Sequence, residues 1–445
     1  MGKGKNIVER AKERASITLV LVIAAGWLLV AGNTLLNNDL IEQEALVQSA
    51  EKYRNEQLYV LAVQGYQEAL SNYQTERNDE YEKSLLNLYQ EAGMTEEYYS
   101  LIESRAEQGR AEAEEYLSRA KALIESGAIR NALSFLQDGI ERTENQELID
   151  LRESVLYAYT LSAIDYEKIQ LPSEDWMIPV FDGKLWGYIG PDGKKCLDFI
   201  YEDASPFSNG YAVVKTEGNY TAIDEEGYWY AVDPNQLDSV EAFLGGKIAG
   251  TKAGQRRIFS KSFEPINETV YEDICLNDNG LVFVKTNGKW SLLNSELEPV
   301  TDQQFEDVVK NSRGQAYESG SAVVADESGY FLLDEEGDAR FETRFAQAKG
   351  IEGGWFAVSD NEGNWGFSDF NGNLVIEYQY SDAYSFSDRL AAVQYAGKWG
   401  YINQYGDIMI EPQFEEAWPF LTGKAMTKDD MGIYRILELK YYELF

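Results

Sequence analysis

A short motif built around Trp-Gly recurs through the second half of the chain, and it constrains the fold more than any other feature. The clearest copy is Trp399-Gly400, and Trp365-Gly366 stands 34 residues before it. Another copy begins at Trp186. A repeat of this kind predicts an array of similar units in which each unit shares a hydrophobic core with its neighbours.

Seven units can be counted, and a final half-unit surrounds residues 432–436. In each unit we expect the large aromatic residue to fill the shared core and the glycine after it to let a neighbouring backbone or ring come close. The positions to which we assign this structural role are Trp186, Gly187, Tyr220, Trp290, Tyr330, Trp365, Gly366, Trp399 and Gly400. Ser291 and Phe331 stand where glycine is expected, so their two units depart from the pattern.

One unit reads as a β-hairpin followed by a third short strand. Runs such as residues 391–394 precede a Gly-Lys-Trp turn, and residues 398–402 follow it. An Asp-x-x-Gly or Asn-Gly turn comes next, and an aromatic-acid-acid-Ala sequence such as residues 201–204 ends the unit. These marks resemble the bacterial WG-repeat family, from about Trp176 to the C-terminus. The resemblance implies a repeat architecture and no particular chemistry, because that family is defined by its repeat.

For residues 175–445 we therefore predict an all-β repeat array, a β-propeller of about seven blades. The chain enters the array part-way through a unit, at residues 176–180, and leaves it through residues 433–436. Such staggered ends allow the last strand to complete the first blade and close the ring. Units of about 34 residues are short beside the ~40–45 residues of a WD-type blade, and blades of three strands or an open stacked β-solenoid are the alternatives. Nearly equivalent hairpins at both ends of the array also leave the choice between seven and eight blades open.

The segment 38–168 contains no proline and has apolar residues at helical spacing, so it is predicted to be a helical repeat module. Gly93 and Gly127 stand 34 residues apart, each at the expected turn of a helix pair. This segment resembles tetratricopeptide repeats more faintly than the later segment resembles WG repeats, and a generic stack of helical hairpins is the alternative. A proline at Pro172 marks the domain boundary.

The N-terminus carries a membrane-anchor pattern. Residues 1–16 are basic, and the stretch from Ile17 to Leu36 holds no charged residue, which is long enough to span a bilayer. The positive-inside rule predicts a single-pass protein of the cell membrane, with residues 1–16 cytoplasmic and the C-terminal bulk extracytoplasmic. A cleaved signal peptide and a buried core helix are the alternatives for residues 17–36. The predicted fold class is accordingly α+β multidomain: one transmembrane helix, tetratricopeptide-like helical hairpins and the β array.

The amino-acid composition excludes several classes of function. The chain has no histidine, which excludes His-based acid–base catalysis, Ser-His-Asp triads and histidine metal sites, and its net charge of −37 opposes binding to nucleic acid. Two cysteines are too few for a disulfide framework or a zinc site. The Asp-Glu-Glu-Gly sequences at 224–227 and 334–337 do not fit a calcium loop, so we interpret them as turns and predict no metal, cofactor or catalytic residue.

The function predicted from these features is a non-catalytic, membrane-anchored scaffold of a bacterial cell envelope that binds a protein partner, because repeat folds present extended surfaces. The alternative is an envelope glycan binder or a carboxylate-based glycan hydrolase, which a cleft with two symmetry-breaking acids ringed by tryptophan would favour. The aromatics outside the repeat position are candidates to face such a ligand: Trp176, Trp229, Trp355 and Trp418.

Overall fold

The computed structural model describes residues 38–173, 175–208, 210–233 and 237–444, and these form two compact units that divide between Arg152 and Glu153. The predicted transmembrane helix at 17–36 lies outside the described residues. None of the helices within the described ranges combines the length and the apolar character that a membrane crossing needs. The transmembrane helix of the predicted fold class is therefore not part of the fold described below.

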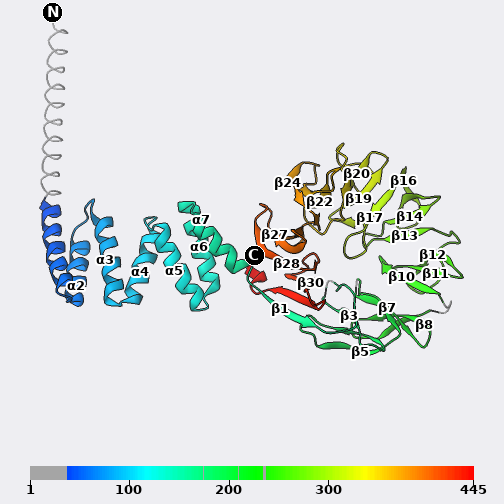
Figure 1. Ribbon diagram of the computed structural model, residues 1–445, viewed down its shortest axis with the longest axis horizontal. Coiled ribbons are helices and arrows are strands. Elements are labelled where there is room, and N and C mark those ends of the chain that lie inside the picture. The colour runs from blue at the N-terminus through cyan, green and yellow to red at the C-terminus, as the bar shows by residue number, and fades with distance from the viewer. Residues whose placement is uncertain (1–37, 174, 209, 234–236, 445) are drawn as a thin grey trace, which may run out of the picture. The chain divides into compact units, whose positions relative to one another are not determined.

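The first unit is an array of antiparallel helices, and its first described helix covers residues 38–55 (Figure 1). Gly93 ends one helix in the left-handed conformation, with φ of 69°, and Gly127 does so with φ of 80°. Only glycine adopts this conformation without steric cost, so both residues make the turns that the sequence indicates. The helices are α2 (Tyr59–Asn72), α3 (Asn78–Ala92), α4 (Thr95–Glu107), α5 (Ala113–Glu125), α6 (Ile129–Thr143) and α7 (Gln146–Leu156).

A buried arginine ties three of these helices together. Arg105 in α4 has no exposed surface, and its guanidinium donates to Glu115 of α5 at 2.9 Å and to Glu82 of α3 at 2.9 Å. It also donates to Asp79 at 2.7 Å and to the carbonyl of Arg110 at 3.0 Å. A charge removed from water is tolerated only when it is paired in this way. The tetratricopeptide resemblance of this unit stays a prediction.

The second unit is a β-propeller whose described residues form eight antiparallel sheets, here called blades 1 to 8 (Figure 1). The first four contain β2 (Lys168–Ile169), β3 (Ile178–Phe181), β4 (Trp186–Ile189) and β5 (Lys195–Tyr201); β6 (Asp203–Ala204), β7 (Tyr211–Thr216), β8 (Asn219–Asp224) and β9 (Trp229–Val232); β10 (Ser239–Leu244), β11 (Lys247–Lys252) and β12 (Gln255–Ser260); β13 (Asp273–Leu276), β14 (Val282–Thr286), β15 (Lys289–Leu293) and β16 (Pro299–Phe305).

The other four blades continue round the ring, and in each blade the first strand lies nearest the centre (Figure 1). They contain β17 (Asp307–Val309), β18 (Tyr317–Glu318), β19 (Ser321–Asp326) and β20 (Gly329–Leu333); β21 (Gln347–Ala348), β22 (Phe356–Ser359), β23 (Trp365–Ser368) and β24 (Leu374–Tyr380); β25 (Asp382–Ala383), β26 (Ala391–Tyr395), β27 (Lys398–Ile402) and β28 (Ile408–Phe414); β29 (Glu416–Ala417), β30 (Lys424–Lys428), β31 (Tyr434–Leu439) and β1 (Tyr159–Ile164). A short 3-10 helix, η1 (Tyr442–Leu444), follows.

The ring closes within blade 8, where β1 pairs with β31 from Tyr159 opposite Leu439 to Ile164 opposite Tyr434. The predicted propeller is confirmed, but the preferred number of about seven blades is wrong, because the described residues form eight. The final half-unit at 432–436 becomes a complete blade because β1, which precedes the repeats, supplies its outer strand. The predicted closure, in which the last strand completes the first blade, is also wrong. β1 lies inside the segment 38–168 that we predicted to be helical, and it carries no Trp-Gly motif that could reveal it.

The glycine of the motif allows a backbone to come close. A Cβ atom on Gly400 would lie 2.5 Å from the carbonyl oxygen of Ile410, and on Gly366 it would lie 2.5 Å from that of Ile376. At Gly187 it would instead meet the ring of Phe199 at 2.8 Å. In blade 7 the pairing of β27 with β28 shifts register at this glycine. Glycine is therefore required because the bulged outer strand occupies the space of a side chain.

We expect Ile164→Ala to weaken ring closure. Ile164 is 4% exposed and packs with the cluster of blades 8 and 1, so its truncation should lower the free energy of unfolding by about 2–4 kcal/mol. The matched control is Leu161→Ala in the same strand, which is 38% exposed and should change stability by about 0.5 kcal/mol at most. Urea denaturation followed by tryptophan fluorescence measures both, and equal effects would contradict this account of closure.

We expect Gly400→Ala to destabilise the propeller by about 2 kcal/mol or more, because β28 must move to admit the methyl group. Gly190→Ala is the control, since its Cβ would first meet a carboxylate oxygen of Asp192 at 3.3 Å, which a small side-chain shift relieves. Thermal unfolding of the two variants should show the larger loss for Gly400→Ala. A loss as large for Gly190→Ala would argue against a specific role for the motif glycine.

Candidate functional site

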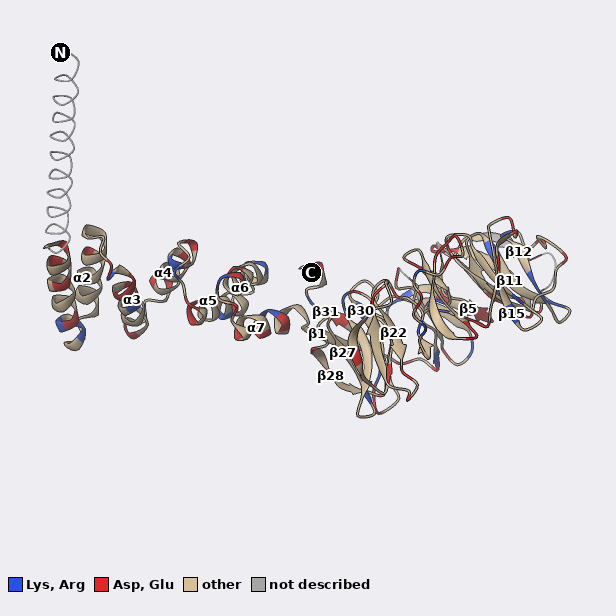
Figure 2. Cartoon of the chain, turned by 90° about the horizontal axis from the view of Figure 1, so that it is seen from above, with Lys and Arg blue, Asp and Glu red and all other residues tan. Residues whose placement is uncertain are grey.

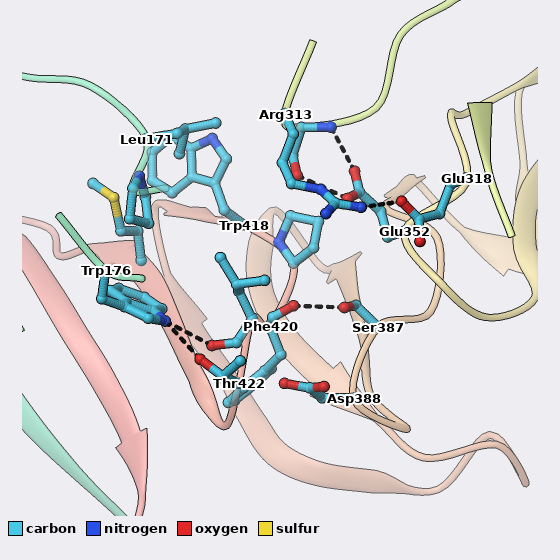
Figure 3. A pocket seen from close by; sticks show the side chains of 15 residues that line it. Leu171, Trp176, Arg313, Glu318, Glu352, Ser387, Asp388, Trp418, Phe420 and Thr422 are labelled. Atoms are coloured by element: carbon cyan, nitrogen blue, oxygen red, sulfur yellow. Dashed lines mark hydrogen bonds and ion pairs between the residues drawn. The ribbon is translucent and has the colours of Figure 1, made fainter. Parts of the chain in front are cut away.

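A pocket of about 200 Å³ lies where five neighbouring blades meet (Figure 3). Its lining comes from the segments between the first and second strands of blades 1, 5, 6, 7 and 8. The lining residues in these segments are 171–172, 176, 312–313, 352, 387–388 and 418–422, and Glu318 in β18 and Met426 in β30 complete the lining. Because the first strand of each blade is nearest the centre of the ring, segments far apart in the sequence meet here.

Tight turns hold two of these segments in place. Ser387 pairs with Leu390 and Leu421 pairs with Lys424, so each segment ends in a two-residue hairpin turn. The central residues have positive φ, 49° and 76° for Thr422-Gly423 and 49° and 65° for Asp388-Arg389. Type I′ turns require this conformation at both positions, and glycine is usual at the second. Arg389 adopts it without being glycine, which marks blade 7 as an exception.

Asp388 joins the turns of blades 7 and 8. One carboxylate oxygen of Asp388 accepts the backbone N–H of Gly423 at 2.7 Å, and the other accepts the hydroxyl of Tyr442 at 3.1 Å. The Ser387 hydroxyl donates to the carbonyl of Phe420 at 2.6 Å, as Figure 3 shows. These bonds fix an acidic side chain at one wall of the pocket.

Two tryptophans contribute to the apolar lining of the pocket. The buried Trp176 donates its indole N–H to the carbonyl of Leu421 at 2.8 Å and to the hydroxyl of Thr422 at 3.0 Å (Figure 3). Trp418 is half-buried and stacks on Tyr434 with ring centroids 6.0 Å apart. Each ring therefore has a fixed orientation.

Glu352 is the acid with the most perturbed environment in the pocket. Its carboxylate accepts the backbone N–H of Ser312 at 2.6 Å and the hydroxyl of the same residue at 2.8 Å. Burial raises the pKa of Glu352 to about 7, and the hydrogen bonds from Ser312 and the positive charge of Arg313 offset only part of that effect. The guanidinium of Arg313 forms an ion pair with Glu318 (Figure 3). The pocket thus holds three carboxylates and one cation.

Comparison with known proteins agrees with the repeat pattern. The sequence profile described as "WG containing repeat" matches residues 186–220, 365–399 and 399–430. WG repeats therefore account for three stretches of the propeller, which run from blade 1 into blade 2, from blade 6 into blade 7 and from blade 7 into blade 8. No curated protein matches the chain.

Solved structures with a similar arrangement share little sequence with this WG-repeat protein. A crystal structure of a eukaryotic initiation factor is 11% identical, covers 60% of this chain and 83% of its own, and has a TM-score of 0.41. The Pan2 WD40 domain of Neurospora crassa is 9% identical, covers 64% and 96%, and has a TM-score of 0.33.

The aromatic residues at the WG-repeat positions belong to the blades rather than to the pocket. Those that are nearly inaccessible pack in core clusters between their own blade and the next one, while Trp186 and Tyr330 are half-buried. The nearly inaccessible residues, with their exposed fractions, are Tyr220 at 6%, Trp290 at 3%, Trp365 at 7% and Trp399 at 7%.

The structure brings together two of the four tryptophans that we considered as ligand-facing. Trp176 and Trp418 line the pocket. Trp229 is 62% exposed on β9, the last strand of blade 2, and Trp355 packs against Phe386 with ring centroids 5.8 Å apart. Position in the sequence could not separate these pairs, because all four stand outside the repeat position.

Sequence reasoning missed the charged residues of the pocket. Glu352, Arg313 and Asp388 were not singled out, although all three line the pocket. The available signal was the replacement of the usual turn glycine by Arg389, together with an acid at Glu352 that no other unit repeats. Departure from the WG pattern was therefore a better guide to the site than the pattern itself.

In the two Asp-Glu-Glu-Gly turns, the aspartate side chain accepts a hydrogen bond from the backbone. A carboxylate oxygen of Asp224 accepts the N–H of Tyr228 at 2.8 Å, and Asp334 accepts the N–H of Asp338 at 2.8 Å. Within the described residues, no group of three or more acids or cysteines is arranged to hold a metal ion.

The raised pKa of Glu352 predicts a pH effect on stability. The folded state keeps this proton up to about pH 7, whereas an ordinary glutamate loses it near 4.5, so the contribution of Glu352 to stability falls as pH rises between these values. Glu352→Gln removes the charge, and the variant should gain about 1 kcal/mol relative to the native chain on going from pH 5 to pH 8. Urea denaturation at both pH values measures this gain. Glu362→Gln, at an exposed turn, is the control and should show no such gain.

Proposed function

We propose that this WG-repeat protein is a non-enzymatic scaffold that binds a protein partner at the pocket of its propeller. The observation that carries the proposal is the pocket itself, where segments of five blades place two tryptophans beside three carboxylates and a guanidinium. Binding energy at protein interfaces is concentrated in small pockets that accept one anchoring side chain.

The charge of the chain supports a basic partner. Asp and Glu number 76 against 39 for Lys and Arg. Figure 2 shows acidic residues along the helices and across the loops of the propeller. Such an excess speeds encounters with positively charged proteins and disfavours nucleic acid.

The proposal extends to location only through the sequence. The basic residues of 1–16 and the uncharged stretch 17–36 favour a single-pass protein with its bulk outside a bacterial cytoplasmic membrane. Both segments lie outside the described residues, so this location stays a prediction.

A glycan is the second candidate ligand. Trp176 and Trp418 share the pocket with Glu352 and Asp388, and these acids do not recur in the other WG repeats. Aromatic rings beside symmetry-breaking acids suit a sugar or, if the acids stand about 5–10 Å apart across the bond, its hydrolysis. The pocket volume of about 200 Å³ is small for this purpose, because sites for small molecules usually measure roughly 300–1,000 Å³.

Affinity capture with the full chain tests the proposal. We expect a protein from the source cells to bind the native chain and to be lost with Trp418→Ala, because truncation of a central anchor typically costs about 2 kcal/mol or more. Trp229→Ala, an exposed tryptophan on β9, is the matched control and should leave binding unchanged. A glycan array probed with the same chains separates the candidates, since retention of a glycan without a protein partner would overturn the scaffold.

A further inference from the structure

We infer that the five-blade pocket accepts the side chain of a lysine from a basic protein partner. This inference rests on the proposed function and names the group that the scaffold would recognise. It follows from the size of the pocket, its apolar walls and the distribution of charge around it.

The volume suits one long side chain. The pocket volume of about 200 Å³ lies below the range of roughly 300–1,000 Å³ that is usual for small-molecule sites, and single side chains commonly anchor protein interfaces by filling pockets. Leu171, Trp176, Trp418 and Phe420 line it with apolar surface. The four-carbon stem of lysine can lie against such walls while its ammonium group continues to the polar end.

The charge in the pocket favours a cation. Glu318, Glu352 and Asp388 oppose the single guanidinium of Arg313, and that guanidinium is paired with Glu318. A carboxylate can accept about four hydrogen bonds, and an ammonium group offers three donors. Trp176 already lies under the ammonium group of Lys424, 5.9 Å from its ring centroid, so the face of Trp418 that does not stack on Tyr434 would add the cation–π attraction, which strengthens where water is excluded.

The shape of the cation also matters. Arg313 already places a planar guanidinium beside Glu352. The guanidinium of an arginine ligand would therefore be repelled by that of Arg313. An ammonium group is compact, so it can contact the carboxylate of Glu352 or Asp388 from any direction and does not need to lie in the carboxylate plane. These features favour lysine over arginine.

Protonation of Glu352 should then control affinity. The groups that act on its carboxyl are Ser312, which donates two hydrogen bonds, Arg313 and Glu318, and the nearby hydroxyl of Tyr384 is influenced by its charge. Burial raises the pKa of Glu352 to about 7, and a bound ammonium would favour the ionised form. Affinity should therefore fall when the pH drops below about 7.

The test uses the full chain labelled with 5-fluorotryptophan and observed by fluorine NMR. Trp176→Phe and Trp418→Phe assign the two pocket resonances. Nα-acetyl-lysine amide is the probe, and Nα-acetyl-norleucine amide is its control because it keeps the apolar stem and lacks the ammonium group. We expect a saturable shift of the Trp418 resonance with the lysine probe and none with the norleucine probe.

Glu352→Gln keeps the shape of the side chain and should weaken the lysine probe by about tenfold, since it removes a charged hydrogen-bond acceptor. It should also abolish the loss of affinity between pH 8 and pH 6. Glu362→Gln, outside the pocket, should bind as the native chain does. An unchanged affinity for Glu352→Gln or an equal response to norleucine would overturn the inference.

The experiments distinguish failure of the protein-binding scaffold from failure of the lysine-binding pocket. If the captured partner depends on Trp418 but the lysine probe gives no shift, the scaffold stands and the lysine pocket is wrong. If glucose shifts the pocket resonances and lysine does not, the glycan alternative replaces it. If the lysine probe binds but no protein is captured, the pocket stands without the scaffold.

Discussion

The pairing of β1 with β31 is the interaction on which the propeller depends. Each blade packs its faces against two neighbours, so a ring with an unfilled last blade would expose apolar surface and an unpaired strand edge. β1 fills that place with six paired residues, from Tyr159 to Ile164. Closure thus joins the start of the unit to its end, and it fixes the number of blades at eight.

Within the ring, the WG motif solves one packing problem repeatedly. The tryptophan fills the core between one blade and the next, and the glycine beside it leaves room for the bulged outer strand, as Gly400 does for Ile410. The acids in the turns accept backbone N–H groups and so stabilise the connections between strands. These roles recur in the blades that share one geometry, and for that reason they say little about function.

The candidate site lies where the side chains differ from one blade to the next. Five blades contribute unlike side chains to one pocket, and each of those side chains sits in a segment whose backbone the fold already holds. Asp388 is bound to the turn of blade 8, Trp176 to the same turn, and Glu352 to Ser312 of blade 5. A site assembled in this way is preorganised, because its groups lose little further freedom when a ligand binds.

The sequence by itself determined the repeat and the turn chemistry, because Trp-Gly and the turn sequences Asn-Gly and Asp-x-x-Gly act on the residues next to them. It favoured a β-propeller over an open β-solenoid but did not decide between them. It also indicated the helical hairpins ended by Gly93 and Gly127. Only the tertiary structure decided the eighth blade, because β1 is recognisable as its strand only when paired with β31. The pocket likewise required the ring, since Trp176 and Trp418 are separated by more than half the chain and meet only after blade 8 closes onto blade 1.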